Sequence, residues 1–160
     1  MFGETEREAA AALLNHCKKH GFSLAVAESC TGGLIAALLT EIPGSSAVFD
    51  RGFITYSNAS KTQLLDVNPG LIAQHGAVSE PVAVAMAKGA RLRAGVDVSV
   101  AVTGIAGPEG GSKEKPVGTV CIGAECAEGR EVKTFHFSGN RSEIRLQAAM
   151  AALKMADELI

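Results

Sequence analysis

A short segment near the first glycine pair combines a serine, a cysteine and a threonine. Residues 27–33 read AESCTGG, so Ser29 and Thr31 come just before Gly32 and Gly33. An apolar run precedes this segment and a helical pattern follows it, which predicts a turn between a strand and a helix. The glycines let the backbone approach a ligand, and the N–H groups that begin the helix could hold an anion or an oxyanion. The turn could therefore carry a nucleophile, but Ser29 or Thr31 could equally serve only as a helix cap.

A second candidate for chemistry is a lysine on the next predicted helix. Lys61 lies four residues after Ser57, so the two share one face of a helix. A lysine acts as a general base when burial lowers its pKa, because removal from water disfavours the ammonium form. A nearby serine then becomes a nucleophile. Most lysines are solvated at the surface, and the sequence leaves both environments open for Lys61.

Other side chains could replace this serine–lysine pair. Cys30 is adjacent to Ser29 and is the more reactive nucleophile when it is ionised. Histidine could supply a base, but no histidine adjoins a glycine-rich segment; the four are His16, His20, His75 and His136. No ordering of Ser, His and Asp is evident, so a serine–lysine pair is the more economical hypothesis.

Two further features are compatible with an anionic ligand. The loop at residues 104–116 (GIAGPEGGSKEKP) is rich in glycine but lacks the Gly-Lys-Ser/Thr signature of a phosphate-binding P-loop. Its N–H groups could line a pocket, or it could be only a mobile connection. Arg141 and Arg145 lie one turn apart on the last predicted helix and could bind a phosphate or a carboxylate together. They could equally be solvated.

The order of elements predicts how these residues are positioned. Apolar spacing and caps predict helices at residues 5–20, 34–40, 57–65, 69–75, 79–95 and 141–160. Apolar runs predict strands at residues 22–27, 47–56 and 97–103, then a hairpin of residues 117–126 and 132–137 across Gly129. We expect one domain over residues 1–160, an α/β fold with a three-layer α/β/α sandwich and a mixed, largely parallel sheet. Ligands bind beyond the carboxyl ends of such strands, which favours the exits at residues 28–33 and 103–111.

Composition narrows the function classes. The 160 residues are 47% hydrophobic and 20% charged, enough for one core. The net charge of -2, the absence of Trp and a single Tyr argue against nucleic acid as a partner. No apolar run reaches the ~20 residues that cross a bilayer, and the first twelve residues are acidic, so we expect a cytoplasmic protein without membrane contact. The four cysteines lack the spacing of a disulfide framework or a zinc site.

Six segments, in chain order, resemble a known family. The resemblance is to the CinA C-terminal domain family, the nicotinamide-nucleotide amidases, and it spans nearly the whole chain. The segments are AESCTGG (27–33), GFITYSN (52–58), GAVSEP (76–81), TGIAGP (103–108), KPVGTV (115–120) and FSGNR (137–141).

This resemblance implies hydrolysis of the carboxamide of nicotinamide mononucleotide to nicotinate mononucleotide and ammonia, in pyridine-nucleotide salvage and without a metal or cofactor. Ser29 matches the nucleophile and Lys61 its base, and we expect N–H groups of Thr31, Gly32 and Gly33 to hold the oxyanion. The expected substrate contacts are Glu28, Tyr56, Asn58, Thr103, Gly104, Arg141 and, more weakly matched, Arg145. Glu28 could face the cationic pyridinium ring or interact with the start of the helix.

Alternatives to the enzyme remain open. A glycine-lined pocket with Arg141 could bind a phosphorylated metabolite without catalysis. The family's competence and DNA-damage label also suggests an accessory protein in DNA processing, which the net charge opposes. Many relatives carry a larger N-terminal domain, so we expect this chain to resemble the stand-alone form. The resemblance also suggests a homo-oligomer, most simply a dimer.

Overall fold

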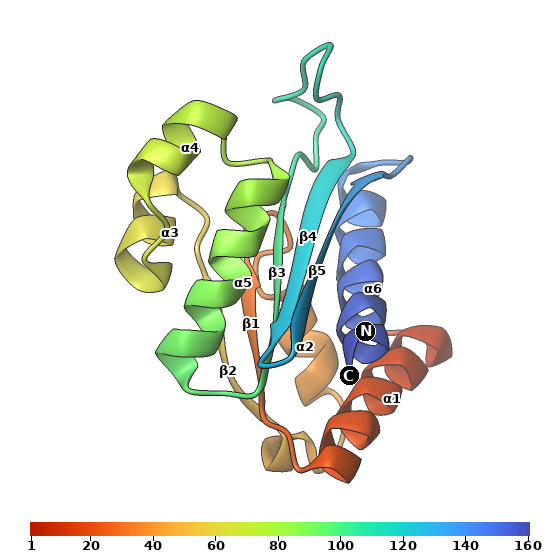
Figure 1. The fold of residues 1–160 in the computed structure, drawn as a ribbon. Coiled ribbons are helices and arrows are strands. Elements are labelled where there is room, and N and C mark those ends of the chain that lie inside the picture. Colours follow the sequence, from red (N-terminus) through yellow and green to blue (C-terminus); the bar gives the residue numbers. More distant parts are fainter.

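The computed structural model describes residues 1–160 and is built around one five-stranded sheet (Figure 1). The strand order is β2–β1–β3–β4–β5. β1 pairs in parallel with β2 and with β3, whereas β3–β4 and β4–β5 are antiparallel. The predicted mixed α/β sheet is therefore confirmed, and its parallel part consists of the first three strands. The strand bounds are β1 (Leu24–Glu28), β2 (Phe49–Ile54), β3 (Val98–Gly104), β4 (Thr119–Cys126) and β5 (Gly129–His136).

Helices cover both faces of this sheet. One face is covered by α1 (Glu4–His20), α2 (Leu34–Thr40) and α6 (Arg141–Leu159). The other face is covered by α3 (Asn58–Leu65), α4 (Pro69–His75) and α5 (Glu80–Ala94). Figure 1 shows these two layers on either side of the strands. None of the helices is both long and apolar enough to cross a membrane.

The central strands are buried along their length because both of their faces are covered. Every residue of β1 is buried, and so are all residues of β3 up to Thr103. This explains why these two strands are nearly continuous apolar runs in the sequence rather than alternating ones. Ser99, near the start of β3, donates its hydroxyl to the carbonyl of Ala87. The other polar residues of these two strands, Glu28 and Thr103, lie near the carboxyl ends, where the site is expected.

The predicted elements differ from the observed ones mainly at the sheet edges. β2 is shorter than the predicted strand because residues 45–47 form a 3₁₀ turn before it. β5 begins at Gly129 rather than at Val132, so Arg130 and Glu131 belong to the strand. β5 is an edge strand with most side chains exposed, and charged residues are common on such edges because they discourage further pairing.

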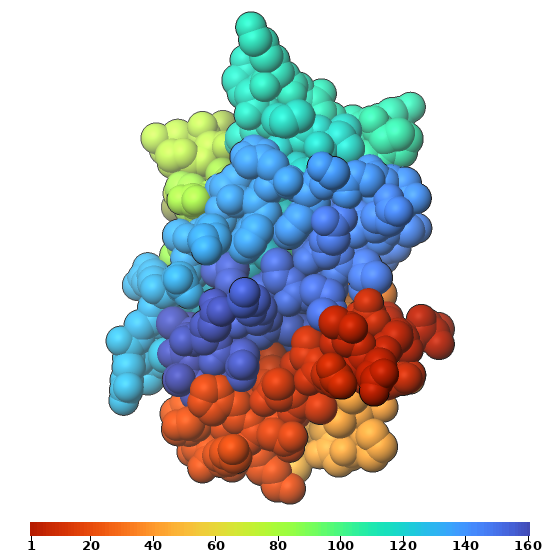
Figure 2. All heavy atoms as spheres, turned by 90° about the vertical axis from the view of Figure 1, so that its right-hand side faces the viewer, coloured from red at the N-terminus to blue at the C-terminus, as the bar shows by residue number.

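Helix ends follow ordinary capping rules. Asn140 and Glu143 form a capping box at the start of α6, and Ser57 caps α3 by accepting a hydrogen bond from the Ser60 N–H. At the same end of the sheet as these caps, the connection between β3 and β4 projects from the body of the molecule, as Figure 2 shows above the face covered by α1 and α6. The carboxyl ends of β1 and β3 therefore open beside a long loop.

Candidate active site

Ser29 lies directly beyond the carboxyl end of β1, between the two neighbouring strands. Its N–H donates to the carbonyl of Val102 at 3.0 Å, and the carbonyl of Glu28 accepts from the Thr55 N–H at 2.8 Å. These contacts extend the parallel sheet by one residue and fix the start of the turn. The Ser29 side chain is buried, with 8% of the residue exposed.

The turn after Ser29 requires its two glycines. The N–H of Gly32 donates to the carbonyl of Ser29 at 3.0 Å, which closes a tight turn. Gly32 and Gly33 have φ angles of 57° and 103°, in the left-handed region that side chains strain. The sequence AESCTGG therefore folds into a turn that points Ser29 toward the end of the sheet.

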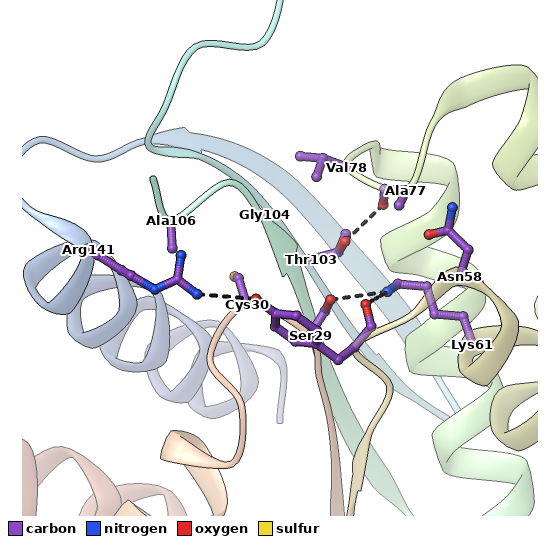
Figure 3. A pocket seen from close by; sticks show the side chains of 11 residues that line it. Ser29, Cys30, Asn58, Lys61, Ala77, Val78, Thr103, Gly104, Ala106 and Arg141 are labelled. Carbon is purple, nitrogen blue, oxygen red and sulfur yellow. Dashed lines mark hydrogen bonds between the residues drawn. The ribbon is translucent and has the colours of Figure 1, made fainter. Parts of the chain in front are cut away.

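Lys61 meets Ser29 from the helix that follows β2. Lys61 is buried, with only 1% of its surface exposed. Its Nζ lies 3.1 Å from Ser29 Oγ (Figure 3). The same Nζ donates to the carbonyl of Thr55 at 2.7 Å, with the carbonyl of Tyr56 at 3.4 Å. The residues predicted as nucleophile and base are thus within hydrogen-bonding distance, although 32 positions separate them in the chain. Ser57, which shares a helical face with Lys61 in the sequence, caps α3 instead.

Burial lowers the pKa of Lys61 below its ordinary value of 10.5, because the ammonium form loses its hydration. Glu28, the buried carboxylate next to Ser29 in the chain, is engaged elsewhere. Its two oxygens accept hydrogen bonds from the N–H groups of Ile35 and Ala36 at 2.9 and 3.0 Å. The neutral amine is therefore favoured without a carboxylate that would hold its proton.

Cys30 is poorly suited to act as the nucleophile. Burial raises the pKa of its thiol to about 11, although a backbone hydrogen bond and the nearby guanidinium of Arg145 lower it in part. The thiolate is the reactive form, so at neutral pH this thiol is almost entirely protonated. The hydroxyl of Ser29, with a basic partner beside it, is the stronger candidate.

A cavity of about 180 Å³ opens above Ser29 and Lys61. Eleven residues line it. Seven of them were expected at the site from the sequence: Ser29, Tyr56, Asn58, Lys61, Thr103, Gly104 and Arg141. The other four are Cys30, Ala77, Val78 and Ala106. Ala77 and Val78 lie in the GAVSEP segment and Ala106 in TGIAGP, so these two segments of the resemblance were the available signal for them.

The cavity mouth is formed by Tyr56, Arg141 and Gly107. Arg141 reaches in from α6, opposite Asn58 and Ala77 (Figure 3). Its Nη1 donates to the carbonyl of Gly107 at 2.7 Å, and its Nη2 donates to the Tyr56 hydroxyl at 3.2 Å. This places a permanent positive charge where a substrate would enter.

Thr103 closes one wall of the cavity. Its hydroxyl donates to the carbonyl of Ala77 at 2.9 Å, across 26 positions of the chain. This bond ties the end of β3 to the segment before α5. The wall that carries Ala77 and Val78 is thereby fixed relative to Ser29.

Five expected site residues do not line the cavity. Glu28 holds the start of α2, as described above, and Arg145 donates to the carbonyls of Cys30 and Thr31 at 3.0 and 2.8 Å. The N–H of Gly32 is used within the turn. The N–H groups of Cys30, Thr31 and Gly33 have no acceptor within the chain. The cavity thus holds a hydroxyl, an amine and a guanidinium, which suits acyl transfer on a ligand with an anionic tail.

The chain is similar to known proteins along nearly its whole length. The family model described as the CinA C-terminal domain matches residues 6–160. A protein named nicotinamide-nucleotide amidohydrolase PncC from Enterobacter agglomerans is 55% identical over 140 residues, which cover 87% of this chain and 85% of that protein. A CinA-like protein from Geotalea uraniireducens is 53% identical over 151 residues, which cover 94% of this chain. The chain spans only 35% of the length of that relative.

Solved structures show the same fold. The crystal structure of the competence/damage inducible protein CihA from Agrobacterium tumefaciens superimposes with a TM-score of 0.97 at 44% identity, covering 99% of this chain and 98% of that one. A CinA superfamily protein from Escherichia coli gives a TM-score of 0.93 at 33% identity. With nearly its full length matched in sequence and in structure, the chain belongs to the CinA C-terminal domain family.

Proposed function

We propose that the chain hydrolyses the carboxamide of nicotinamide mononucleotide, giving nicotinate mononucleotide and ammonia. The observation that carries the proposal is the 3.1 Å separation of Ser29 Oγ and Lys61 Nζ in a buried cavity. The 55% identity with a relative named nicotinamide-nucleotide amidohydrolase supports the choice of substrate. This hydrolysis of nicotinamide mononucleotide is a reaction of pyridine-nucleotide salvage.

Lys61 acts as the base in its neutral form. A neutral amine has two N–H groups and one lone pair. The two carbonyls of Thr55 and Tyr56 accept the N–H groups, which leaves the lone pair for the Ser29 hydroxyl. An ammonium ion would donate to all three oxygens and could not accept the serine proton. Three acceptors would also satisfy an ammonium ion, so the support for the base comes from burial, which lowers the pKa of Lys61.

The first half of the reaction forms an acyl-enzyme. Ser29 Oγ attacks the carboxamide carbon while its proton passes to Nζ of Lys61. The C–N bond then breaks, and the ammonium of Lys61 returns the proton to the departing nitrogen, which leaves as ammonia. Neutral Lys61 next takes a proton from water as the water attacks the ester. Collapse releases the acid and restores the Ser29 hydroxyl.

The N–H of Cys30 is the best placed donor for the oxyanion. It has no acceptor within the chain, and Cys30 lines the cavity whereas Thr31, Gly32 and Gly33 do not. The free N–H groups of Thr31 and Gly33 lie in the same turn. Loss of one such donor typically costs ~3 kcal/mol of transition-state stabilisation, so the shape of this turn matters for the rate.

The cavity size indicates which part of the substrate enters. A volume of about 180 Å³ is below the ~300 Å³ that begins the usual range for ligand pockets. We infer that the pyridine ring and its carboxamide occupy the cavity, while the ribose and phosphate lie at the mouth. Arg141 is the charged group there and would contact the phosphate.

The test is release of ammonia from nicotinamide mononucleotide by the purified protein. We expect turnover by the wild type, loss of turnover in Ser29→Ala, and wild-type turnover in Ser46→Ala, which removes an exposed serine far from the cavity. Calorimetry with the same nucleotide accompanies the assay. Tight binding without ammonia release would instead assign the chain to the non-catalytic binding proteins.

A further inference from the structure

Two arginines of α6, one turn apart, have separate environments. The guanidinium of Arg141 lines the cavity. That of Arg145 does not, and it is engaged by two consecutive backbone carbonyls: its Nε donates to Cys30 at 3.0 Å and its Nη2 to Thr31 at 2.8 Å. Both carbonyls belong to the turn that follows Ser29. Arg145 therefore contacts the backbone of the turn after Ser29 from the side of α6, outside the cavity.

These two bonds set the orientation of N–H groups on the other side of the turn. In a trans peptide the N–H points opposite to the carbonyl of the preceding residue. The peptide between Cys30 and Thr31 is trans. Fixing the Cys30 carbonyl on the guanidinium therefore directs the N–H of Thr31 away from Arg145, and this N–H has no acceptor within the chain. The Thr31 carbonyl likewise fixes the N–H of Gly32, which donates to the Ser29 carbonyl. The Ser29 carbonyl shares its peptide with the N–H of Cys30, so this bond directs the Cys30 N–H to the opposite side.

The peptide between Cys30 and Thr31 has no other hydrogen bond within the chain. The Thr31 hydroxyl is buried and makes no hydrogen bond. Gly32 and Gly33 have the greatest backbone freedom of any residues. Glu28 holds the N–H groups of α2 beyond the turn, so it does not fix the peptide planes at Cys30 and Thr31. The peptide of the Thr31 carbonyl is also held by the Leu34 N–H, which donates to that carbonyl at 3.1 Å, and by the bond from the Gly32 N–H to Ser29. The Cys30 carbonyl accepts from Arg145 alone, so the guanidinium is the hydrogen-bond partner that fixes the peptide between Cys30 and Thr31.

We propose that Arg145 is a positioning residue, which keeps the peptides after Ser29 in the orientation that presents free N–H groups to the oxyanion. This inference rests on the proposed role of Ser29 as the nucleophile. It gives Arg145 no contact with the substrate, in contrast to Arg141. Removing Arg145 should therefore slow the chemical step and leave substrate binding nearly intact.

The experiment measures the reactivity of Ser29 with a fluorophosphonate, followed by mass spectrometry, beside turnover of nicotinamide mononucleotide. Phosphonylation of Ser29 needs the same oxyanion donors but no nucleotide. In Arg145→Met we expect labelling and kcat each to fall at least tenfold, with KM within threefold of the wild type. Arg145→Lys keeps the charge but cannot bond both carbonyls in a planar fork. Its labelling rate and kcat should lie between those of the wild type and those of Arg145→Met.

Arg93→Met is the matched control. Arg93 also donates through Nε and Nη2, but to the exposed carboxylate of Asp66, far from the cavity. We expect wild-type labelling and turnover in this variant. Should Arg145→Met fail to fold, as thermal unfolding would show, Arg145→Lys provides the comparison.

Three results would overturn the proposal. Wild-type labelling in Arg145→Met would show that the turn keeps its shape unaided. A tenfold rise in KM with unchanged labelling would make Arg145 a substrate contact. If Ser29 of the wild type reacts with neither fluorophosphonate nor nucleotide, the proposal for Arg145 loses its basis. Labelling that slows in Arg145→Met, in a protein that leaves the nucleotide intact, would support Arg145 and contradict only the proposed substrate.

Discussion

The floor and the mouth of the cavity are built in different ways. The floor consists of Ser29, Lys61 and the carbonyl of Thr55, and the mouth consists of Tyr56, Arg141 and Gly107. Thr55 is fully buried whereas Tyr56, its neighbour in the chain, is 62% exposed. The peptide between Thr55 and Tyr56 therefore marks the boundary between the buried floor and the solvent-exposed mouth.

This difference assigns separate tasks to the two regions. The ends of the parallel strands set the geometry of the floor. They hold Ser29 and the segment after β2 side by side, so that Lys61 lies within hydrogen-bonding distance of Ser29. The mouth depends on one guanidinium that bridges a helix, a loop and a tyrosine. We expect changes at the floor to reduce kcat and changes at the mouth to raise KM.

The largest expected effect comes from removing the pair at the floor. Ser29→Ala and Lys61→Met should each lower kcat about 10⁴-fold, because the nucleophile and its base act as one unit. The double variant should be no slower than either single variant. Ammonia release under saturating nucleotide measures all three. Losses that multiply in the double variant would mean that the two residues act independently.

The next effect is the dependence of the rate on pH. Lys61 must be neutral to accept the serine proton, and burial lowers its pKa below 10.5. As pH rises through this lowered pKa, the neutral fraction grows, so kcat/KM should increase about tenfold per pH unit and then level off below pH 10.5. Initial rates across pH 6 to 10 provide the measurement. A profile that is flat, or that falls with rising pH, would contradict a neutral lysine base.

A smaller effect is expected at the mouth. Arg141→Met should raise KM for nicotinamide mononucleotide about 10- to 100-fold, since hydrogen bonds to charged groups contribute about 1.5–3 kcal/mol. Its kcat should change little. Nicotinamide riboside, which lacks the phosphate, is the internal control, because its KM should be nearly the same in both proteins. An equal rise in KM for the riboside would show that Arg141 does not recognise the phosphate.

The smallest effect is expected for the thiol between the two regions. The pKa of Cys30 is raised to about 11 by burial, so the thiol contributes no nucleophile near neutral pH. Cys30→Ala should keep kcat within tenfold of the wild type, and iodoacetamide at neutral pH should leave the wild type active. A dead Cys30→Ala combined with an active Ser29→Ala would transfer the nucleophile to the cysteine.

The sequence predicts the elements of the fold well and the directions of single side chains poorly. The buried runs at β1 and β3 and the glycine-rich exits after them locate the site, because burial of both sheet faces leaves a clear pattern in the residues. The spacing of Arg141 and Arg145 cannot show that one lines the cavity and the other binds the turn. That division depends on where α6 packs against the sheet.

The state of Lys61 is a similar case. Residues 57–61 read as an ordinary polar helix start, and nothing in them reveals that the residue is 1% exposed. Its burial arises from the turn after β1 and the carbonyl of Thr55, both brought together by the sheet. Glu28 also reads as a residue that could face a cationic ring, yet its carboxylate turns into α2.

The most direct measurement is the titration of Lys61 itself, by NMR of protein carrying ¹³C at the lysine ε carbons. The resonance that disappears in Lys61→Met identifies the residue. We predict that this resonance titrates below the ordinary lysine value of 10.5 and reports a neutral amine in the pH range where ammonia is released. A Lys61 resonance that titrates at 10.5 or above would contradict the central claim.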